Sequence, residues 1–273
     1  ARLFLNCHMA EAEVHSLATG QTATYSARCP GRDSPNEDAA ALIPFDDDSG
    51  VLAVADGLGG GLAGERAATL AVECLRTAIE QGLTSGLMLR TAILNACETA
   101  NEAVLALGLG AATTLAVVEI QGRTVRPYHV GDSMILVVGG RGKIKLQTTP
   151  HSPVGFAVEA GMLDEGDAIH HHDRHVVSNV IGSSEMKIEI GPTVELAPRD
   201  TVLVASDGVF DNLHVTETVE CVRKGRLAGV AARLAACAGS RMKGGEQTQP
   251  SKPDDLTFIL FRLSSPQTRP QVH

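Results

Sequence analysis

The stretch from Leu52 to Gly61 constrains the fold most, because it joins a buried strand to a carboxylate and a glycine-rich turn. It reads Leu-Ala-Val-Ala-Asp-Gly-Leu-Gly-Gly-Gly. A short apolar run closed by a turn signal is typical of a buried strand. Asp56 therefore lies where the backbone leaves the core, and the glycines let backbone atoms approach whatever it holds. Because a buried, unpaired carboxylate is costly to ionise, Asp56 needs a cation, a metal or hydrogen-bond donors beside it, unless it is only a helix cap.

Aspartates recur at the ends of predicted strands along the chain. They are Asp38, Asp56, Asp132, Asp207 and Asp254. One such residue is explained as a cap, whereas five can converge at one rim of a sheet structure. Oxygen ligands without paired histidine or cysteine suit hard cations such as Mg²⁺ or Mn²⁺. Carboxylates gathered at one site cannot all stay ionised without cations, and two metals roughly 3.5–4 Å apart can activate water and grip a phosphoryl oxygen.

The hydrophobic pattern predicts a mixed α+β chain. Short β-branched segments follow one another between residues 113 and 148 without helices, which favours an antiparallel meander over βαβ units. Further strands are predicted at 22–27, 39–43, 187–196, 201–205 and 256–263. Amphipathic spacing predicts helices over 63–81, 85–107, 215–224 and 227–238, with Gly82 ending the first and Gly239 the last.

The expected organisation is one domain at residues 22–263, with an irregular insertion at about 149–185. Residues 1–21 are weakly patterned and are expected to form an N-terminal extension or a peripheral strand. Residues 264–273 are expected to be a disordered tail. The consecutive histidines His170, His171 and His172 lie in the insertion and read either as an exposed segment or as a metal site.

Composition excludes some classes of function. The chain has 273 residues and is 44% hydrophobic but only 3% aromatic, so aliphatic side chains must fill the core. Its formal charge of −9 argues against a nucleic-acid surface, which needs a basic stripe. The 6 cysteines show no C-x-x-C spacing, which indicates small apolar residues in a reducing compartment. With no membrane-length apolar run and no signal-peptide pattern at the start, we expect a cytoplasmic protein.

Six stretches, in order, resemble the metal-dependent protein serine/threonine phosphatases of the PPM (type 2C) family, bacterial type. They are Arg32 with Asn36-Glu37-Asp38; residues 54–60 with Gly64-Glu65; residues 112–115; residues 130–133; residues 205–209; and residues 254–257. The resemblance covers roughly residues 22–263, nearly the whole chain. It implies a four-layer α/β/β/α sandwich, in which two antiparallel sheets carry helices outside and metals at one end. Residues 149–185 resemble the family's flap beside that end.

The resemblance also implies a set of metal ligands for two Mn²⁺ or Mg²⁺ ions and a third, weaker site. Asp56 would bridge both ions, with the Gly57 carbonyl as a further ligand. Asp207 and Asp254 would bind one ion, and Asp38 would bind the other, which Glu37 would reach through water. Asp132 with Asp207 would bind the third ion. Arg32 would hold the phosphate, although it lies one residue further from Asn36 than in the family, so Arg28 is its rival. A metal-bridging hydroxide would attack phosphorus in line, without a covalent enzyme intermediate.

Other positions depart from the family pattern. Leu58 replaces a histidine proposed as general acid in many members, and Asp255 replaces the usual asparagine. Pro150-His151 stands where Asp-His is usual, and Met134 stands in place of an arginine. These departures keep a catalytically silent binding or sensing module open as an alternative. A two-metal nuclease is disfavoured by the acidic charge, and a phosphatase specific for one signalling regulator is a further subclass.

The partners implied are phosphorylated proteins, with a cognate serine/threonine kinase as a candidate. Neither nucleic acid nor a membrane is expected to bind, and the chain is expected to be a monomer.

Overall fold

The computed structural model describes residues 1–58, 60, 62–108, 110–244 and 249–264. Gly59 and Gly61 of the glycine turn, and the predicted tail from residue 265 onward, lie outside the described residues.

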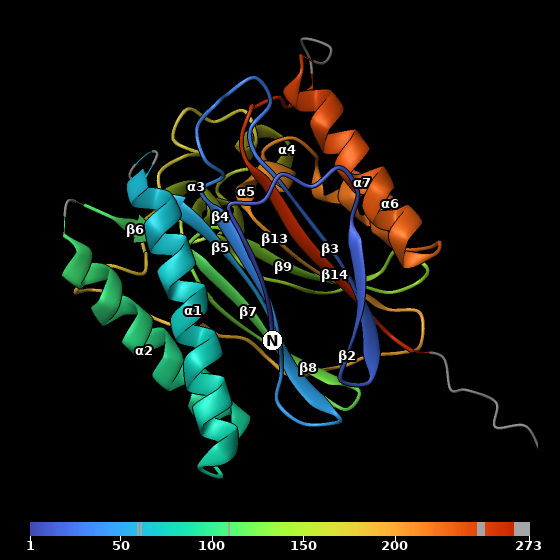
Figure 1. Cartoon of the computed structure of the whole chain (residues 1–273). Helices are drawn as coiled ribbons and strands as arrows, with labels where there is room; N and C mark the ends of the chain where they lie inside the picture. The colour runs from blue at the N-terminus through green and yellow to red at the C-terminus, as the bar shows by residue number, and fades with distance from the viewer. Residues whose placement is uncertain (59, 61, 109, 245–248, 265–273) are drawn as a thin grey trace, which may run out of the picture.

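Two antiparallel sheets form the centre of the molecule (Figure 1). The first has the order β1 (Arg2–Leu5), β4 (Asp38–Pro44), β5 (Ser49–Leu58), β7 (Leu115–Gln121), β8 (Thr124–Val130) and β11 (Glu189–Ile190), with β6 (Ala112–Thr113) beside β5 and β12 (Val194–Glu195) beside β8. The second has the order β10 (Ile144–Gln147), β9 (Met134–Val138), β13 (Thr201–Ala205), β14 (Leu256–Leu263), β3 (Gly20–Ala27) and β2 (Glu13–Leu17).

Helices cover the outer face of each sheet. The pair α1 (Leu62–Thr84) and α2 (Leu89–Leu107) packs on the first sheet, and α6 (Val215–Val222) and α7 (Leu227–Met242) pack on the second (Figure 1). The short helices are α3 (Pro153–Glu159), α4 (Glu165–Ala168) and α5 (Asp207–Phe210). The predicted α/β/β/α sandwich is therefore confirmed.

Strand β4 shows why these strands read as continuous apolar runs. Ala39 and Ala41 pack beneath α1, whereas Ala40 and Leu42 face the second sheet. Side chains alternate between the faces of a strand, so a strand covered on both faces needs apolar residues throughout.

The predicted meander between residues 113 and 148 is wrong at its middle. Strands β7 and β8 pair in the first sheet, but β9 and β10 pair in the second. The chain crosses between sheets at Gly131, whose φ of 105° is a left-handed conformation that glycine tolerates. A Cβ there would lie 2.6 Å from the Thr114 Cβ.

Two predicted helix ends are also wrong, because both glycines lie inside helices. Helix α1 continues through Gly82 to Thr84, and α7 continues through Gly239 to Met242. A Cβ on Gly82 would lie 2.8 Å from the Ala92 Cβ, so this glycine lets α1 and α2 pack closely. Helix α2 begins at Leu89 rather than at residue 85.

The remaining strand predictions differ in smaller ways. The strand predicted at 187–196 is two short strands, β11 and β12, which both pair with β8 around Gly191 and Pro192. Near the N-terminus, β1 pairs with β4 and β2 with β3, as peripheral strands of different sheets. The division between residues 21 and 22 stays a prediction. Among the described residues, no helix is both long enough and apolar enough to span a membrane.

Candidate metal centre

Asp38 and Asp56 face each other at one end of the first sheet. They are direct register partners in the β4–β5 pair, so their side chains lie on the same face. Asp38 is buried, and its Oδ2 accepts a hydrogen bond of 2.8 Å from Ser206 Oγ. Because Ser206 follows β13 of the second sheet, this bond joins the two sheets at their acidic end.

The backbone of Asp56 is held by two threonines. Its N–H donates to Thr114 Oγ1 at 3.0 Å, and its carbonyl accepts from Thr113 Oγ1 and from the Thr114 N–H, both at 2.8 Å. The hydroxyls of Thr114 and Ser133 lie 2.7 Å apart. Since Ser133 follows Asp132 directly, this chain of bonds fixes Asp56 relative to the crossing between the sheets.

Three further carboxylates gather at the ends of β13 and β14. Oxygen atoms of Asp207, Asp211 and Asp254 lie within 4.8 Å of one another. The Lys252 ammonium lies 2.7 Å from Asp207 Oδ2, 2.7 Å from Asp211 Oδ2 and 2.8 Å from Asp254 Oδ2. The positive charge of Lys252 therefore lies among these three carboxylates.

Sequence reasoning missed Asp211 and Lys252. Asp211 follows Asp207 by four residues, the spacing that brings side chains to one face of a helical turn, and its N–H donates to the Asp207 carbonyl at 2.8 Å. That spacing was a usable signal. Lys252 offered no such signal, because it enters from a polar loop.

Burial raises the pKa values of these carboxyls. It raises the pKa of Asp38 and of Asp56 well above the ordinary range, and neighbouring carboxylates add to the effect. Burial, followed by the charges of Asp207 and Asp211, raises the pKa of Asp132 to about 7. Burial also raises the pKa of Asp207 and of Asp254. Neighbouring buried acids with raised pKa values need cations to ionise together, and an all-oxygen donor set fits Mg²⁺ or Mn²⁺.

Glu37 and Gly57 meet beside this cluster. The Gly57 N–H donates to the Glu37 carbonyl at 3.2 Å. A Cβ on Gly57 would lie 2.2 Å from the Gly64 carbonyl oxygen, and one on Gly64 would lie 2.1 Å from Glu37 Oε2. The close packing of these backbones explains the glycines at both positions and keeps Glu37 near Asp56.

Asp255 holds the loop that carries the two candidate arginines. Its Oδ1 accepts the Cys29 N–H at 2.6 Å, and its Oδ2 accepts the Glu37 N–H at 2.7 Å. A carboxylate can accept both bonds, which gives this departure from the family a structural reason. Arg32 and Arg28 are both exposed, and Arg32 interacts electrostatically with Asp255. The choice between the two arginines for phosphate stays a prediction.

His151 links the insertion to the sheet crossing. The ring Nδ1 of His151 accepts the Gly131 N–H at 3.0 Å. The backbone N–H of His151 donates to the Gly131 carbonyl at 3.0 Å. Its ring stacks on His129 with centroids 4.3 Å apart. These contacts tie the base of residues 149–185 to the sheet crossing.

The structure brings the predicted metal ligands together at one end of the two sheets. They are Asp38, Asp56, Asp132, Asp207 and Asp254.

The half-buried and buried carboxylates at one end of this α/β/β/α sandwich define a candidate centre for divalent cations. The family model for protein phosphatase 2C matches residues 27–240. A putative protein phosphatase 2C-type of Streptococcus pyogenes is 30% identical over 184 residues, 64% of this chain and 74% of that protein. The serine/threonine phosphatase stp of Listeria monocytogenes is 26% identical over 200 residues, 70% of this chain and 79% of that protein.

Solved structures agree with this match. The serine/threonine phosphatase of S. agalactiae has a TM-score of 0.76 at 25% identity, covering 90% of this chain and 100% of that one. The Mycobacterium tuberculosis phosphatase PstP/Ppp has a TM-score of 0.73 at 25% identity, covering 89% and 98%. The chain belongs to the protein phosphatase 2C family.

Proposed function

We propose that this chain hydrolyses phosphoserine and phosphothreonine in proteins, using two Mn²⁺ or Mg²⁺ ions and a third ion at a weaker site. The observation that carries the proposal is the convergence of carboxylates from both sheets at one end of the sandwich. Their raised pKa values support this proposal, because bound positive charge would let these carboxyls ionise together. The amount of acid exceeds what the single Lys252 ammonium offsets.

The residues that would hold the ions fall into groups. Asp56 would bridge two ions; Asp38, Glu37 and the Gly57 carbonyl would serve one, Asp207 and Asp254 the other, and Asp132, Asp207 and Asp211 the third. When bound, the ions supply the charge that polarises the attacking water and holds phosphoryl oxygens.

The chain's own residues position these groups and the substrate. The hydroxyls of Ser206 and Thr257 hydrogen-bond to Asp38 and orient its carboxylate. Thr114 fixes the backbone of Asp56. An arginine of the 28–37 loop, which we assign to Arg32 with Arg28 as the rival, would grip the phosphate through paired N–H donors.

Two matched variants test this function. Hydrolysis of a phosphothreonine peptide would be measured with Mn²⁺, with Mg²⁺ and with chelator, in the native chain and in Asp56→Asn and Asp207→Asn. We expect metal-dependent turnover that both variants lose, whereas Asp47→Asn, on an exposed turn, retains it. A folded native chain without turnover in any metal would instead support the catalytically silent binding module.

Finer expectations belong to the same proposal. They are phosphorylated proteins as substrates, a cognate serine/threonine kinase as partner, a monomeric state and a cytoplasmic location. Light scattering after size exclusion would check the monomeric state.

A further inference from the structure

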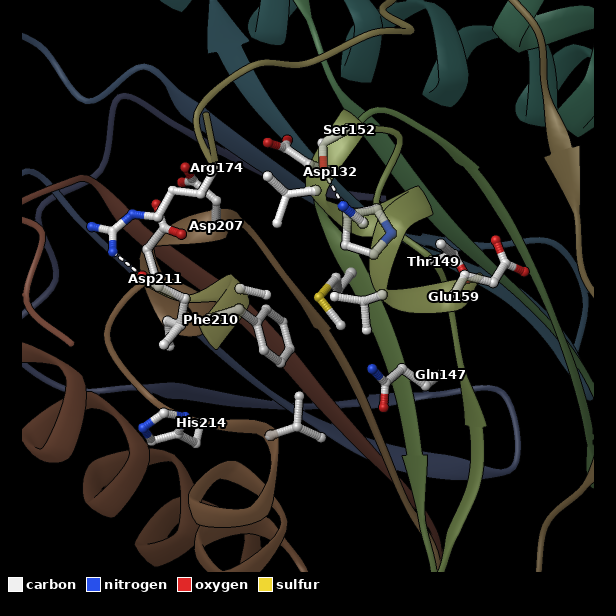
Figure 2. A pocket seen from close by; sticks show the side chains of 18 of the residues that line it. Asp132, Gln147, Thr149, Ser152, Glu159, Arg174, Asp207, Phe210, Asp211 and His214 are labelled. Atoms are coloured by element: carbon white, nitrogen blue, oxygen red, sulfur yellow. Dashed lines mark hydrogen bonds between the residues drawn. The ribbon is translucent and has the colours of Figure 1, made fainter. Parts of the chain in front are cut away.

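A cavity of about 700 Å³ opens beside the acidic end of the sandwich. Asp132, Asp207 and Asp211 line it on the side of the metal centre. Its other walls come from the insertion, through α3 and α4, and from the segment between α5 and α6. Figure 2 shows Asp207, Asp211 and Arg174 on one side of the cavity and Gln147, Thr149 and Glu159 on the opposite side.

Apolar side chains make up much of the lining besides the aspartates. Side chains that line them include Met134, Val154, Val158, Ile169, Phe210 and Leu213. Met134 is the residue that stands where the family usually has arginine, so an apolar side chain replaces a charge in this wall. A concave apolar surface with a few polar groups is typical of a binding site.

The charged groups around the cavity are mostly acidic. Besides the three aspartates, Glu159 and Asp164 line it from the insertion. Arg174 also lines it, but its guanidinium donates to the Ile169 carbonyl. Ions bound as proposed would offset the charges of the three aspartates. An acidic ligand group would then meet the like charges of Glu159 and Asp164, whereas an apolar group would bury its surface against the walls.

The volume indicates which part of a substrate can enter. A volume of about 700 Å³ is far more than one phosphoryl group requires and lies within the usual range of ligand pockets. Because Asp132, Asp207 and Asp211 belong both to this wall and to the metal centre, a chain whose phosphate is bound at the centre places its flanking residues at the cavity.

We propose that the cavity binds an apolar side chain of the phosphoprotein substrate, a few residues from the phosphoserine or phosphothreonine, and selects against acidic residues there. This inference rests on the proposed phosphatase function. The cavity would thus determine which phosphorylated sites are processed, while the metal centre performs the hydrolysis.

The test compares substrates with and without flanking residues. A set of phosphothreonine peptides would carry Leu or Glu in turn at each position from three residues before to three after the phosphothreonine. We expect at least one position where kcat/KM is about tenfold higher with Leu than with Glu. The small substrate p-nitrophenyl phosphate, which has no flanking residues, reports the metal centre alone.

Two residues of the insertion provide a matched pair of variants. Val158 lines the cavity, whereas Met162 is 82% exposed and is not among its lining residues. We expect Val158→Glu to abolish the preference for Leu while hydrolysis of p-nitrophenyl phosphate is kept, and Met162→Glu to change neither. Thr216→Glu, at an exposed position of the opposite wall, repeats the test without disturbing the insertion.

Outcomes against the inference are distinct from failure of the proposed function. Equal kcat/KM for Leu and Glu peptides at every position would overturn it. So would a Val158→Glu variant that slows all substrates alike, because the cavity would then serve catalysis or a separate small effector. Absence of hydrolysis of every substrate by the folded native chain with Mn²⁺ would instead reject the phosphatase function.

Discussion

Replacing Lys252 should weaken the metal-free fold and strengthen metal binding. Its ammonium lies 2.7–2.8 Å from oxygens of Asp207, Asp211 and Asp254, and its side chain is 23% exposed. The side chain of Asn212 holds its backbone, accepting the Lys252 N–H at 2.8 Å and donating to the Lys252 carbonyl at 2.9 Å. This lysine is therefore held in place as a tethered cation.

The magnitude follows from the charges. Removing one member of a buried charge network typically costs 3–5 kcal/mol, and partial exposure reduces this, so we expect Lys252→Gln to lower the metal-free unfolding free energy by about 2 kcal/mol. A divalent ion binding Asp207 and Asp254 must compete with the ammonium. Removal of the Lys252 ammonium should therefore tighten Mn²⁺ binding by about 10- to 100-fold, equivalent to about 1.4–2.8 kcal/mol.

Urea unfolding in chelator and calorimetric titration with Mn²⁺ would measure the two effects. Lys252→Arg keeps the charge and should resemble the native chain, and Lys143→Gln removes an exposed lysine as a control. Unchanged metal-free stability together with unchanged or weaker Mn²⁺ binding in Lys252→Gln would refute this reasoning.

Other predictions concern the groups around the centre. Asp255→Asn replaces one acceptor by an NH₂ group that faces a backbone N–H, so urea unfolding should show a loss of about 1–3 kcal/mol. Gly131→Ala places a Cβ 2.6 Å from the Thr114 Cβ at a φ of 105°, and thermal unfolding should show a loss of about 2 kcal/mol or more. The pKa of Asp132, about 7 when folded and lower when unfolded, means that the native state binds more protons between these values. Metal-free stability should therefore fall as pH rises from about 4 to 7, which urea unfolding across this range would measure; a rise would contradict the assignment.

Much of the candidate centre could be predicted from sequence because its carboxylates lie at or near the ends of buried strands. An apolar run that ends in Asp-Gly marks the acidic end of a strand, as at Asp56 and Asp207. The expected turn at Asp56 is wrong, because β5 continues through Asp56 to Leu58 and pairs there with β6. Lys252 and Asp211 could not be found in this way. Lys252 reaches the other carboxylates only after two loops distant in sequence come together, and such proximity is a property of the tertiary fold.

The errors in the fold share a physical cause. Gly82 and Gly239 are local signals for a helix end, but both lie inside helices that continue past them. At Gly82, α1 and α2 pack so closely that a side chain would not fit. Strand succession alone does not reveal which sheet a strand joins, so the sequence predicts a hairpin where the chain crosses between sheets at Gly131.

Asp38 and Asp56 come from one sheet, whereas Asp207 and Asp254 lie at strand ends of the other. The spacing between these two pairs is therefore set by the thickness of the apolar layer between the sheets, which includes Ile135. A change of side-chain volume in that layer, remote from every ligand, alters the separation of the two pairs. With ions bound as proposed, packing in the interior of the sandwich would influence which ion the centre accepts, and selection for ion preference would then act on residues that never touch an ion.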